Sequence, residues 1–99
     1  MYRSLPLKDI RITDPFFTDR IDTARHVTIP YMWDTLNDRI PGVAPSHCIE
    51  NFEIAAGLKQ GEFHGWWFQD TDLWKWLEGV GYSLATHPDA ELEKTADAA

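Results

Sequence analysis

Apolar and charged residues alternate along the chain from Leu5 to Ile12, with one irregularity near Lys8 and Asp9. A period of two is typical of a short β-strand. No second convincing strand follows, and an isolated strand is not stable by itself. We therefore expect this strand to find its partners elsewhere in a larger protein.

A first helix is predicted directly after this segment. Thr13 or Asp14 can cap it, and Pro15 suits the first helical position because proline has no N–H to lose. Apolar or small residues then follow at helical spacing, at Phe17, Ile21, Ala24 and Thr28. Pro30 is expected to end or kink this helix, with room for a further turn or two over Tyr31–Leu36.

The middle of the chain reads as a loop followed by a second helix. Asn37–Pro45 holds two prolines and a glycine, which favours a loop. A helix over Ser46–Leu58 follows, with Ser46 as the N-cap and Gly57 near its end.

Gly61–Gln69 is predicted to be a loop, although it is unusually rich in aromatic residues. Asp70 or Thr71 caps the next helix, which runs to about Thr86. One apolar face of this helix follows helical spacing, and Trp74 and Tyr82 lie on another face. A helix that is apolar on two sides is normally buried on two sides. The first face consists of Leu73, Trp76, Leu77, Val80 and Leu84.

A last helix begins at Pro88, with Asp89 and Glu91 placed to favour its positive end. Its apolar stripe, Leu92, Ala96 and Ala99, reaches the final residue without a C-cap signal. About 12 residues of uncapped helix are marginal in water. We therefore expect the domain to continue beyond residue 99.

Composition and charge narrow the class of protein. The 99 residues suffice for one small domain at most, and four of the five tryptophans fall within eleven positions. A net charge of −7 argues against nucleic acid and anionic membranes as partners. No apolar run approaches a membrane span or a secretory signal. Cys48 is the only cysteine, so no internal disulfide forms, and a cytoplasmic location is expected.

Metal or nucleophile chemistry within this chain is not expected. The four histidines lack the paired short spacings of zinc ligands, and His47 and Cys48 are adjacent, so they point in different directions on a helix. A cysteine on a helix face is usually a small core residue. We therefore expect no catalytic residue, no metal ligand and no bound cofactor in this chain.

The stretch Glu62–Asp70 is the strongest candidate for ligand chemistry. Aromatic faces stack on the C–H face of sugars, while Gln, His and Asp side chains bind hydroxyl groups. The Asp70-Thr71-Asp72 segment admits a sugar-binding role or simple helix capping. The residues alone leave a sugar site and a core-facing loop equally open.

The chain contains five short blocks in order, IPYMW from Ile29, SHCIENF from Ser46, AAG from Ala55, GEFHG from Gly61 and FQDTD from Phe68. As an ordered set they resemble the β-L-arabinofuranosidases of glycoside hydrolase family 127. The segment IPYMW is similar to the family's IPYQW, and SHCIENF is similar to SHAIENF, with Cys48 where alanine is commoner. AAG, GEFHG and FQDTD, the last similar to FQDSD, follow in order, and Lys75–Glu78 completes the run. Together these blocks cover about Ile10 to Asp89.

The resemblance implies a mainly α fold in which this chain forms the first helices of an (α/α)6 barrel. The Leu5–Ile12 strand would then belong to a downstream β-sandwich. It also implies a cysteine thiolate nucleophile held near zinc by further cysteines and a glutamate, with a separate glutamate as acid/base. None of those residues can be placed here, and Cys48 falls where the family has no nucleophile.

We expect substrate binding in the intact enzyme by Phe68, Gln69 and Asp70, because these three residues join an aromatic loop to a helix N-terminus. The implied partners are an L-arabinofuranoside-type sugar and the remainder of the same catalytic domain. Related families with this pattern hydrolyse other furanosides. Two alternatives stay open at this point, a small stand-alone carbohydrate-binding module and a helical protein-interaction module.

Overall fold

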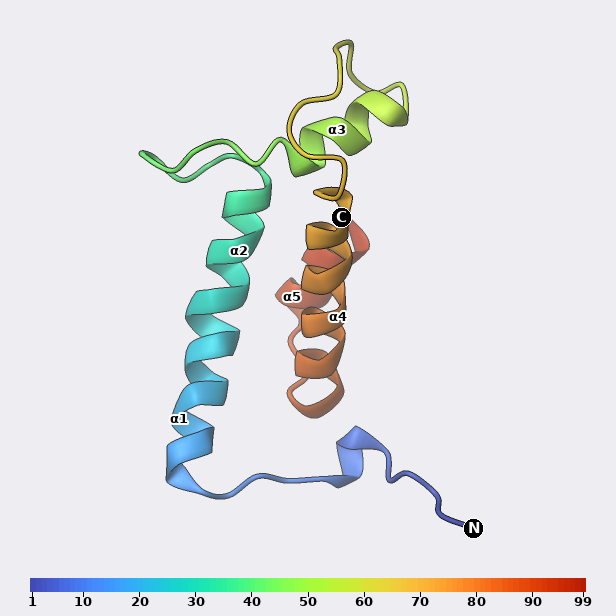
Figure 1. The fold of residues 1–99 in the computed structure, drawn as a ribbon. Coiled ribbons are helices and arrows are strands. Elements are labelled where there is room, and N and C mark those ends of the chain that lie inside the picture. The colour runs from blue at the N-terminus through green and yellow to red at the C-terminus, as the bar shows by residue number, and fades with distance from the viewer.

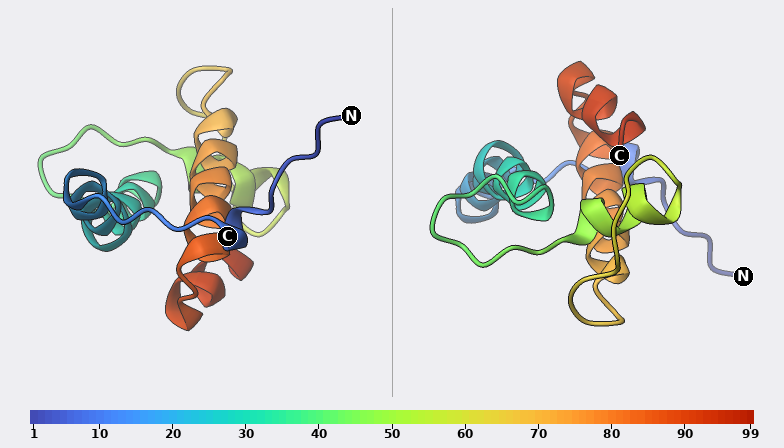
Figure 2. Two further views of the ribbon diagram at one scale, coloured as in Figure 1. Left: turned by 90° about the horizontal axis from the view of Figure 1, so that it is seen from below. Right: turned by 90° about the horizontal axis from the view of Figure 1, so that it is seen from above.

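The computed structural model describes residues 1–99, which form helices and loops without a β-strand. Two long helical rods lie side by side and run in opposite directions, and a short helix lies across one end (Figures 1 and 2). The elements in chain order are η1 (Leu7–Asp9), α1 (Pro15–Thr23), η2 (Ala24–Thr28), α2 (Ile29–Leu36), α3 (Cys48–Ala55), α4 (Asp70–Thr86) and α5 (Ala90–Asp97).

The first rod is continuous through α1, η2 and α2 (Figure 1). It starts as predicted, because the Asp14 carboxylate accepts a hydrogen bond from the Phe17 N–H at 3.3 Å and Pro15 follows the cap. Pro30 does not end the rod. The wider π-helical turn η2 precedes it, and such a turn gives the proline ring room where an α-helical carbonyl would collide with it. The continuation to Leu36 is confirmed.

The strand predicted over Leu5–Ile12 is wrong for this structure. The chain makes one 3-10 turn at η1, in which the Asp9 N–H donates to the Pro6 carbonyl and the Ile10 N–H donates to the Leu7 carbonyl, each at 3.0 Å. The turn coincides with the irregularity in the alternation. A strand needs a hydrogen-bonding neighbour, and no extended segment lies beside this one.

The core lies between α2 and α4. The Trp76 ring stacks on Trp33 with centroids 4.6 Å apart, and its indole N–H donates to the Ile29 carbonyl at 3.0 Å. This confirms the predicted inner face of α4, since three of its members are buried and the other two pack against them. The buried residues are Leu36, Cys48, Leu73, Trp76 and Val80.

The two short helices pack against α4. Helix α5 begins at Ala90, two residues later than the predicted start at Pro88, because Asp89 is its N-cap and its carboxylate accepts from the Glu91 and Leu92 N–H groups, each at 3.1 Å. Helix α3 is shorter than the predicted Ser46–Leu58. It starts at Cys48 because His47 has a left-handed backbone conformation with φ of 56°, which is incompatible with a continuous helix.

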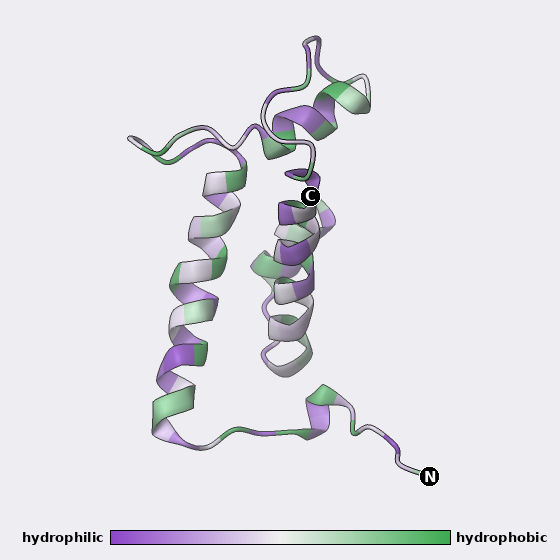
Figure 3. Cartoon of the chain, viewed as in Figure 1, coloured by the Kyte–Doolittle hydropathy of each residue, from purple (hydrophilic) through white to green (hydrophobic).

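The chain is open rather than compact. Its radius of gyration is 16.2 Å, whereas a compact domain of this length has about 13 Å. Its accessible surface is 7851 Å², against about 5,800 Å² for a folded protein of this mass. Hydrophobic positions recur along the α1–α2 rod (Figure 3), and the second apolar face of α4, with Trp74 and Tyr82, is exposed. Much apolar surface therefore lacks a partner within these residues.

None of the helices combines the length and the apolar character that a membrane-spanning helix requires.

Candidate functional site

The candidate site is the aromatic loop, residues 61–69, together with the first turn of α4. Three aromatic rings gather there at the surface. Phe68 stacks with Trp66 at 6.1 Å between centroids and meets Trp67 edge-on at 5.4 Å. Trp67 is nevertheless 84% exposed and Trp66 68% exposed. The loop is therefore not folded under the core of these residues, and its rings are available to a ligand or to further protein.

Gln69 holds the end of this loop through one half of its carboxamide. Its Oε1 accepts a hydrogen bond from the Trp66 N–H at 2.7 Å, while its Nε2 makes no hydrogen bond. This arrangement requires Gly65, whose φ is +96° and where a Cβ would collide with Gln69 Oε1. The Gln69 side chain therefore keeps a free hydrogen-bond donor beside the aromatic rings.

The prediction that Asp70 or Thr71 caps α4 is wrong. Gln69 occupies the N-cap position without a side-chain cap, and the Thr71 hydroxyl donates instead to the Phe68 carbonyl at 2.8 Å. The physical reason is the turn that precedes the helix. Its carbonyls already accept the first helical N–H groups, from Thr71 to Phe68 at 3.2 Å and from Asp72 to Gln69 at 3.1 Å. The exposed Asp70 carboxylate makes no hydrogen bond and lies at the positive end of α4.

Helix α3 holds the loop at two points. The Asn51 Nδ2 donates to the His64 carbonyl at 2.8 Å, and the Asn51 Oδ1 accepts from the His64 N–H at 3.0 Å. At the other end of the loop, the Cys48 Sγ donates to the Gln69 carbonyl at 3.3 Å. Both contacts come from one face of a single short helix, so α3 fixes where the loop enters α4.

Cys48 is a small core residue, as predicted. It is buried, and this burial raises the pKa of its thiol, an effect that the nearby carboxylates of Asp72, Asp70 and Asp38 reinforce. A thiol that stays protonated and inaccessible is a poor nucleophile. Its role in this structure is packing and the hydrogen bond to Gln69.

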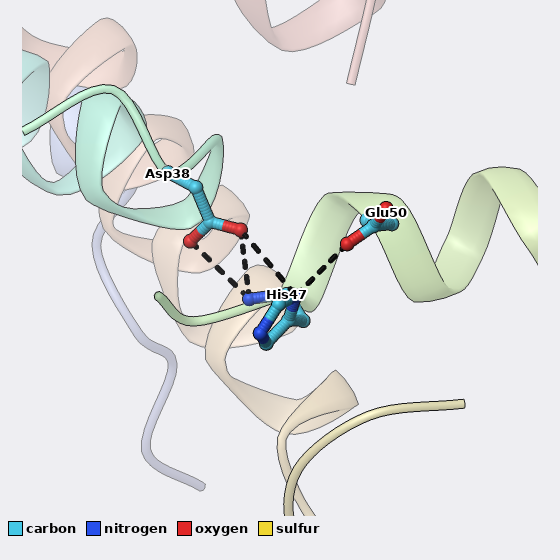
Figure 4. Close-up of side chains that lie close together, drawn as sticks. All are labelled: Asp38, His47 and Glu50. Carbon is cyan, nitrogen blue, oxygen red and sulfur yellow. Dashed lines mark hydrogen bonds and ion pairs between the residues drawn. The ribbon is translucent and has the colours of Figure 1, made fainter. Parts of the chain in front are cut away.

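A polar cluster lies at the start of α3 (Figure 4). The Asp38 carboxylate accepts from the Ser46 N–H at 2.5 Å and the His47 N–H at 3.0 Å. The His47 Nδ1 lies 2.8 Å from the Glu50 Oε2, and the Lys59 ammonium binds the other Glu50 oxygen at 2.5 Å. The hydrogen bond from Lys59, and then that from His47, lower the pKa of Glu50 to about 2.

This cluster is best understood as a clamp on the chain before α3. The side chains of Asp38, His47 and Glu50 offer three ligand atoms within 4.8 Å of one another, which is close enough for a cation. Both carboxylates, however, already accept hydrogen bonds from the chain's own N–H and ammonium donors. Asp38 and His47 also have positive φ, at 58° and 56°, and such backbone needs outside support.

The sequence alone did not reveal this clamp. Asp38 lies nine positions before His47, and the only sequence signal was the spacing of His47 and Glu50 by three on a predicted helix. Of the four histidines, the fold brings His47 and His64 together, with ring centroids 5.1 Å apart. The absence of a metal from this chain stays a prediction.

Comparison with known proteins decides the family. The family model described as "Beta-L-arabinofuranosidase, GH127 catalytic domain" matches residues 9–99. The chain belongs to this family. A non-reducing end β-L-arabinofuranosidase of Bifidobacterium longum subsp. longum is 41% identical over 101 residues, which cover 90% of the chain. The crystal structure of a GH127 β-L-arabinofuranosidase from Geobacillus stearothermophilus T6 superposes with a TM-score of 0.86 and 57% identity over 89% of the chain.

The matched region is a small part of these relatives. This GH127 chain covers 15% of the length of the Bifidobacterium protein and 14% of that of the Geobacillus protein. The resemblance inferred from the sequence blocks is thereby confirmed. A stand-alone binding or interaction module is not favoured, because nearly the whole chain matches a catalytic-domain family.

Proposed function

We propose that residues 1–99 form the N-terminal part of a β-L-arabinofuranosidase catalytic domain and contribute Phe68, Gln69 and Asp70 to its sugar pocket. The observation that carries this proposal is the aromatic loop. It presents exposed rings, a free amide donor and an unengaged carboxylate at one helix N-terminus. Both relatives are β-L-arabinofuranosidases, which supplies the class of substrate, a β-L-arabinofuranoside.

Each of the three residues has a distinct part in this proposal. The rings around Phe68 provide an apolar wall for the C–H face of the sugar. Gln69 donates to a hydroxyl oxygen through Nε2, because Oε1 is already occupied by the Trp66 N–H. Asp70 accepts a hydrogen bond from a sugar hydroxyl group through its carboxylate, which lies at the positive end of α4. Together they bind and orient a furanoside and transfer no proton or glycosyl group.

The open shape of the chain supports its place in a larger domain. The α2–α4 pair is then the first pair of helices of an (α/α)6 barrel that continues into a β-sandwich region. The exposed second face of α4, with Trp74 and Tyr82, is covered by the next helices of the barrel. This accounts for an accessible surface about 2,000 Å² larger than that of a compact protein of equal mass.

The zinc-held thiolate that the family resemblance implies does not fit the residues of this chain. Cys48 is the only cysteine, it is buried, and burial raises the pKa of its thiol. The isolated chain therefore neither hydrolyses an arabinofuranoside nor holds zinc. Dialysis of the purified chain followed by metal analysis tests this, and retention of one zinc per chain would contradict it.

Localisation and other partners form part of the same proposal. A free, buried cysteine suits a reducing compartment, and we place the protein in the cytoplasm. The net charge of −7 argues against nucleic acid and anionic membranes as partners.

A chimera tests the proposed function. Residues 1–99 replace the corresponding N-terminal segment of the Geobacillus relative, and the product is assayed with p-nitrophenyl β-L-arabinofuranoside. Gln69→Glu keeps an oxygen for the Trp66 N–H but removes the free donor. Gln60→Glu adds the same charge at an exposed residue whose side chain makes no hydrogen bond.

We expect Gln69→Glu to lower kcat/KM by at least about fivefold, the scale of one hydrogen bond of ~1 kcal/mol. Gln60→Glu should leave kcat/KM unchanged. A folded but inactive chimera, or a Gln69→Glu variant with unchanged kcat/KM and unchanged stability, would contradict the proposal. The second outcome would mean that the aromatic loop has a structural role only.

A further inference from the structure

Asn51 holds the aromatic loop through two hydrogen bonds to the backbone of one loop residue, His64. Its carboxamide bonds both backbone polar groups of His64, by donation to the carbonyl at 2.8 Å and acceptance from the N–H at 3.0 Å. In an antiparallel sheet, a residue of the neighbouring strand likewise bonds both the N–H and the carbonyl of the residue opposite it. Asn51 is half-buried in α3, thirteen positions before the residue that it holds.

Apart from the His64 ring, whose centroid lies 5.1 Å from that of His47, the first half of the loop has little else to hold it in place. Residues 60–65 lie outside the helices and make no backbone–backbone hydrogen bond. Its second half is held by Gln69 on the Trp66 N–H and by Cys48 on the Gln69 carbonyl. The position of the loop between its two ends therefore depends on the pair formed by Asn51 and His64.

Helix α3 is itself held in place, so a side chain on this helix can keep the aromatic loop at a fixed position. Cys48 is buried against α4, and the clamp of Asp38, His47 and Glu50 holds the turn before the helix. Lys59 closes the other side, because it binds Glu50 from the chain that follows α3. A side chain on such a support can hold an exposed loop without touching a ligand.

We propose that Asn51 is a positioning residue for the sugar pocket, which sets the place of Phe68 and Gln69 through the backbone of His64. The inference rests on the proposed function, since it concerns the same loop. A pocket on an exposed loop binds its ligand more tightly when the loop is pre-organised, because ligand binding then does not have to order the loop. A small misplacement of binding groups lowers turnover strongly even when the responsible residue lies outside the pocket.

The test compares three variants of the chimera, each of which carries a single substitution. Asn51→Ala removes both hydrogen bonds to His64, and Asn51→Asp keeps the acceptor but loses the donor. The matched control is Asn37→Ala, because Asn37 also donates from its amide to a backbone carbonyl, that of Trp33 at 2.8 Å, but it does not contact the aromatic loop.

We expect Asn51→Ala to lower kcat/KM about tenfold, mainly through a higher KM, while Asn37→Ala stays near the unsubstituted chimera. Asn51→Asp should fall between the two. Because Asn51 acts through the loop that carries Gln69, the double variant Asn51→Ala with Gln69→Glu should lose less kcat/KM than the product of the two single fold-losses. Equal losses of thermal stability in Asn51→Ala and Asn37→Ala would separate this effect from general destabilisation.

Hydrogen exchange keeps the inference testable whatever the activity of the chimera. The His64 N–H should exchange faster in Asn51→Ala while the amides of α3 keep their rates. Unchanged exchange of His64 would overturn the proposal, as would a KM for Asn51→Ala equal to that of Asn37→Ala. If Gln69→Glu lowers kcat/KM and Asn51→Ala does not, only the positioning role fails. If Gln69→Glu has no effect, the proposed pocket fails.

Discussion

Replacement of Trp76 by phenylalanine tests the packing that places α2 beside α4. The substitution keeps an aromatic ring against Trp33 but removes the indole N–H that donates to the Ile29 carbonyl at 3.0 Å. Loss of that hydrogen bond costs about 1 kcal/mol. The smaller ring also buries about 40 Å² less apolar surface, which costs about 1 kcal/mol at 25 cal/mol per Å². Trp76 is only 6% exposed, so solvent cannot compensate for either loss.

A total of about 2 kcal/mol corresponds to roughly 30-fold more frequent opening of the α2–α4 contact. Hydrogen exchange followed by mass spectrometry on the chimera measures this for peptides from α2. Trp74→Phe is the matched control, because it makes the same substitution two residues away on the exposed face of α4. Exchange in α2 that is unchanged by Trp76→Phe, or equally accelerated by Trp74→Phe, would refute the reasoning.

Three further predictions follow from exposure, backbone conformation and charge. The 99-residue chain alone should self-associate and bind a hydrophobic dye, and a monomer with a sharp melt and no dye binding would contradict this. Gly65→Ala should destabilise the chimera by about 1–3 kcal/mol more than Gly42→Ala, in limited proteolysis or melting experiments. Both glycines have positive φ, but only at Gly65 does a Cβ meet another group, Gln69 Oε1. Lys59→Ala should raise the pKa of Glu50 from about 2 toward its ordinary 4.5, as measured by NMR titration of the carboxyl carbon, and an unchanged titration would contradict the pairing. Because folding lowers this pKa, the stabilisation from Glu50 is complete above pH 4.5 and is lost as the pH falls toward 2.

Helix starts were predictable where a short local motif controls them. Asp14 followed by Pro15 caps α1 as expected, because a carboxylate can reach the N–H group three residues on. The start of α5 was predicted at Pro88, two residues too early, since Asp89 caps the helix from outside it. The inner face of α4 was equally predictable, since side chains three and four positions apart share one side of a helix. The ordered sequence blocks also indicated the family correctly, because several short motifs in a fixed order are specific together although each alone is weak.

The failures have physical causes that lie outside the local sequence. The alternation over Leu5–Ile12 indicated a strand, but a strand also requires a hydrogen-bonding neighbour, and none lies beside it. Asp70 suited an N-cap by residue type, but the turn after the aromatic loop had already engaged the first amides of α4. Pro30 suited a helix end, but the π-helical turn before it let the rod continue.

The sequence by itself therefore determined the mainly helical class and the family, and it predicted the stretch that we propose as the candidate site. These depend on residue types at short separations, and short separations fix faces and caps. Only the tertiary structure decided which groups of that stretch are free. It occupies Gln69 Oε1 but leaves Nε2 open, releases Asp70 from capping, and brings Asn51 to His64 and Asp38 to His47. Such pairings join residues that are distant in the chain, and they exist only because the loops fold back onto α3 and α4.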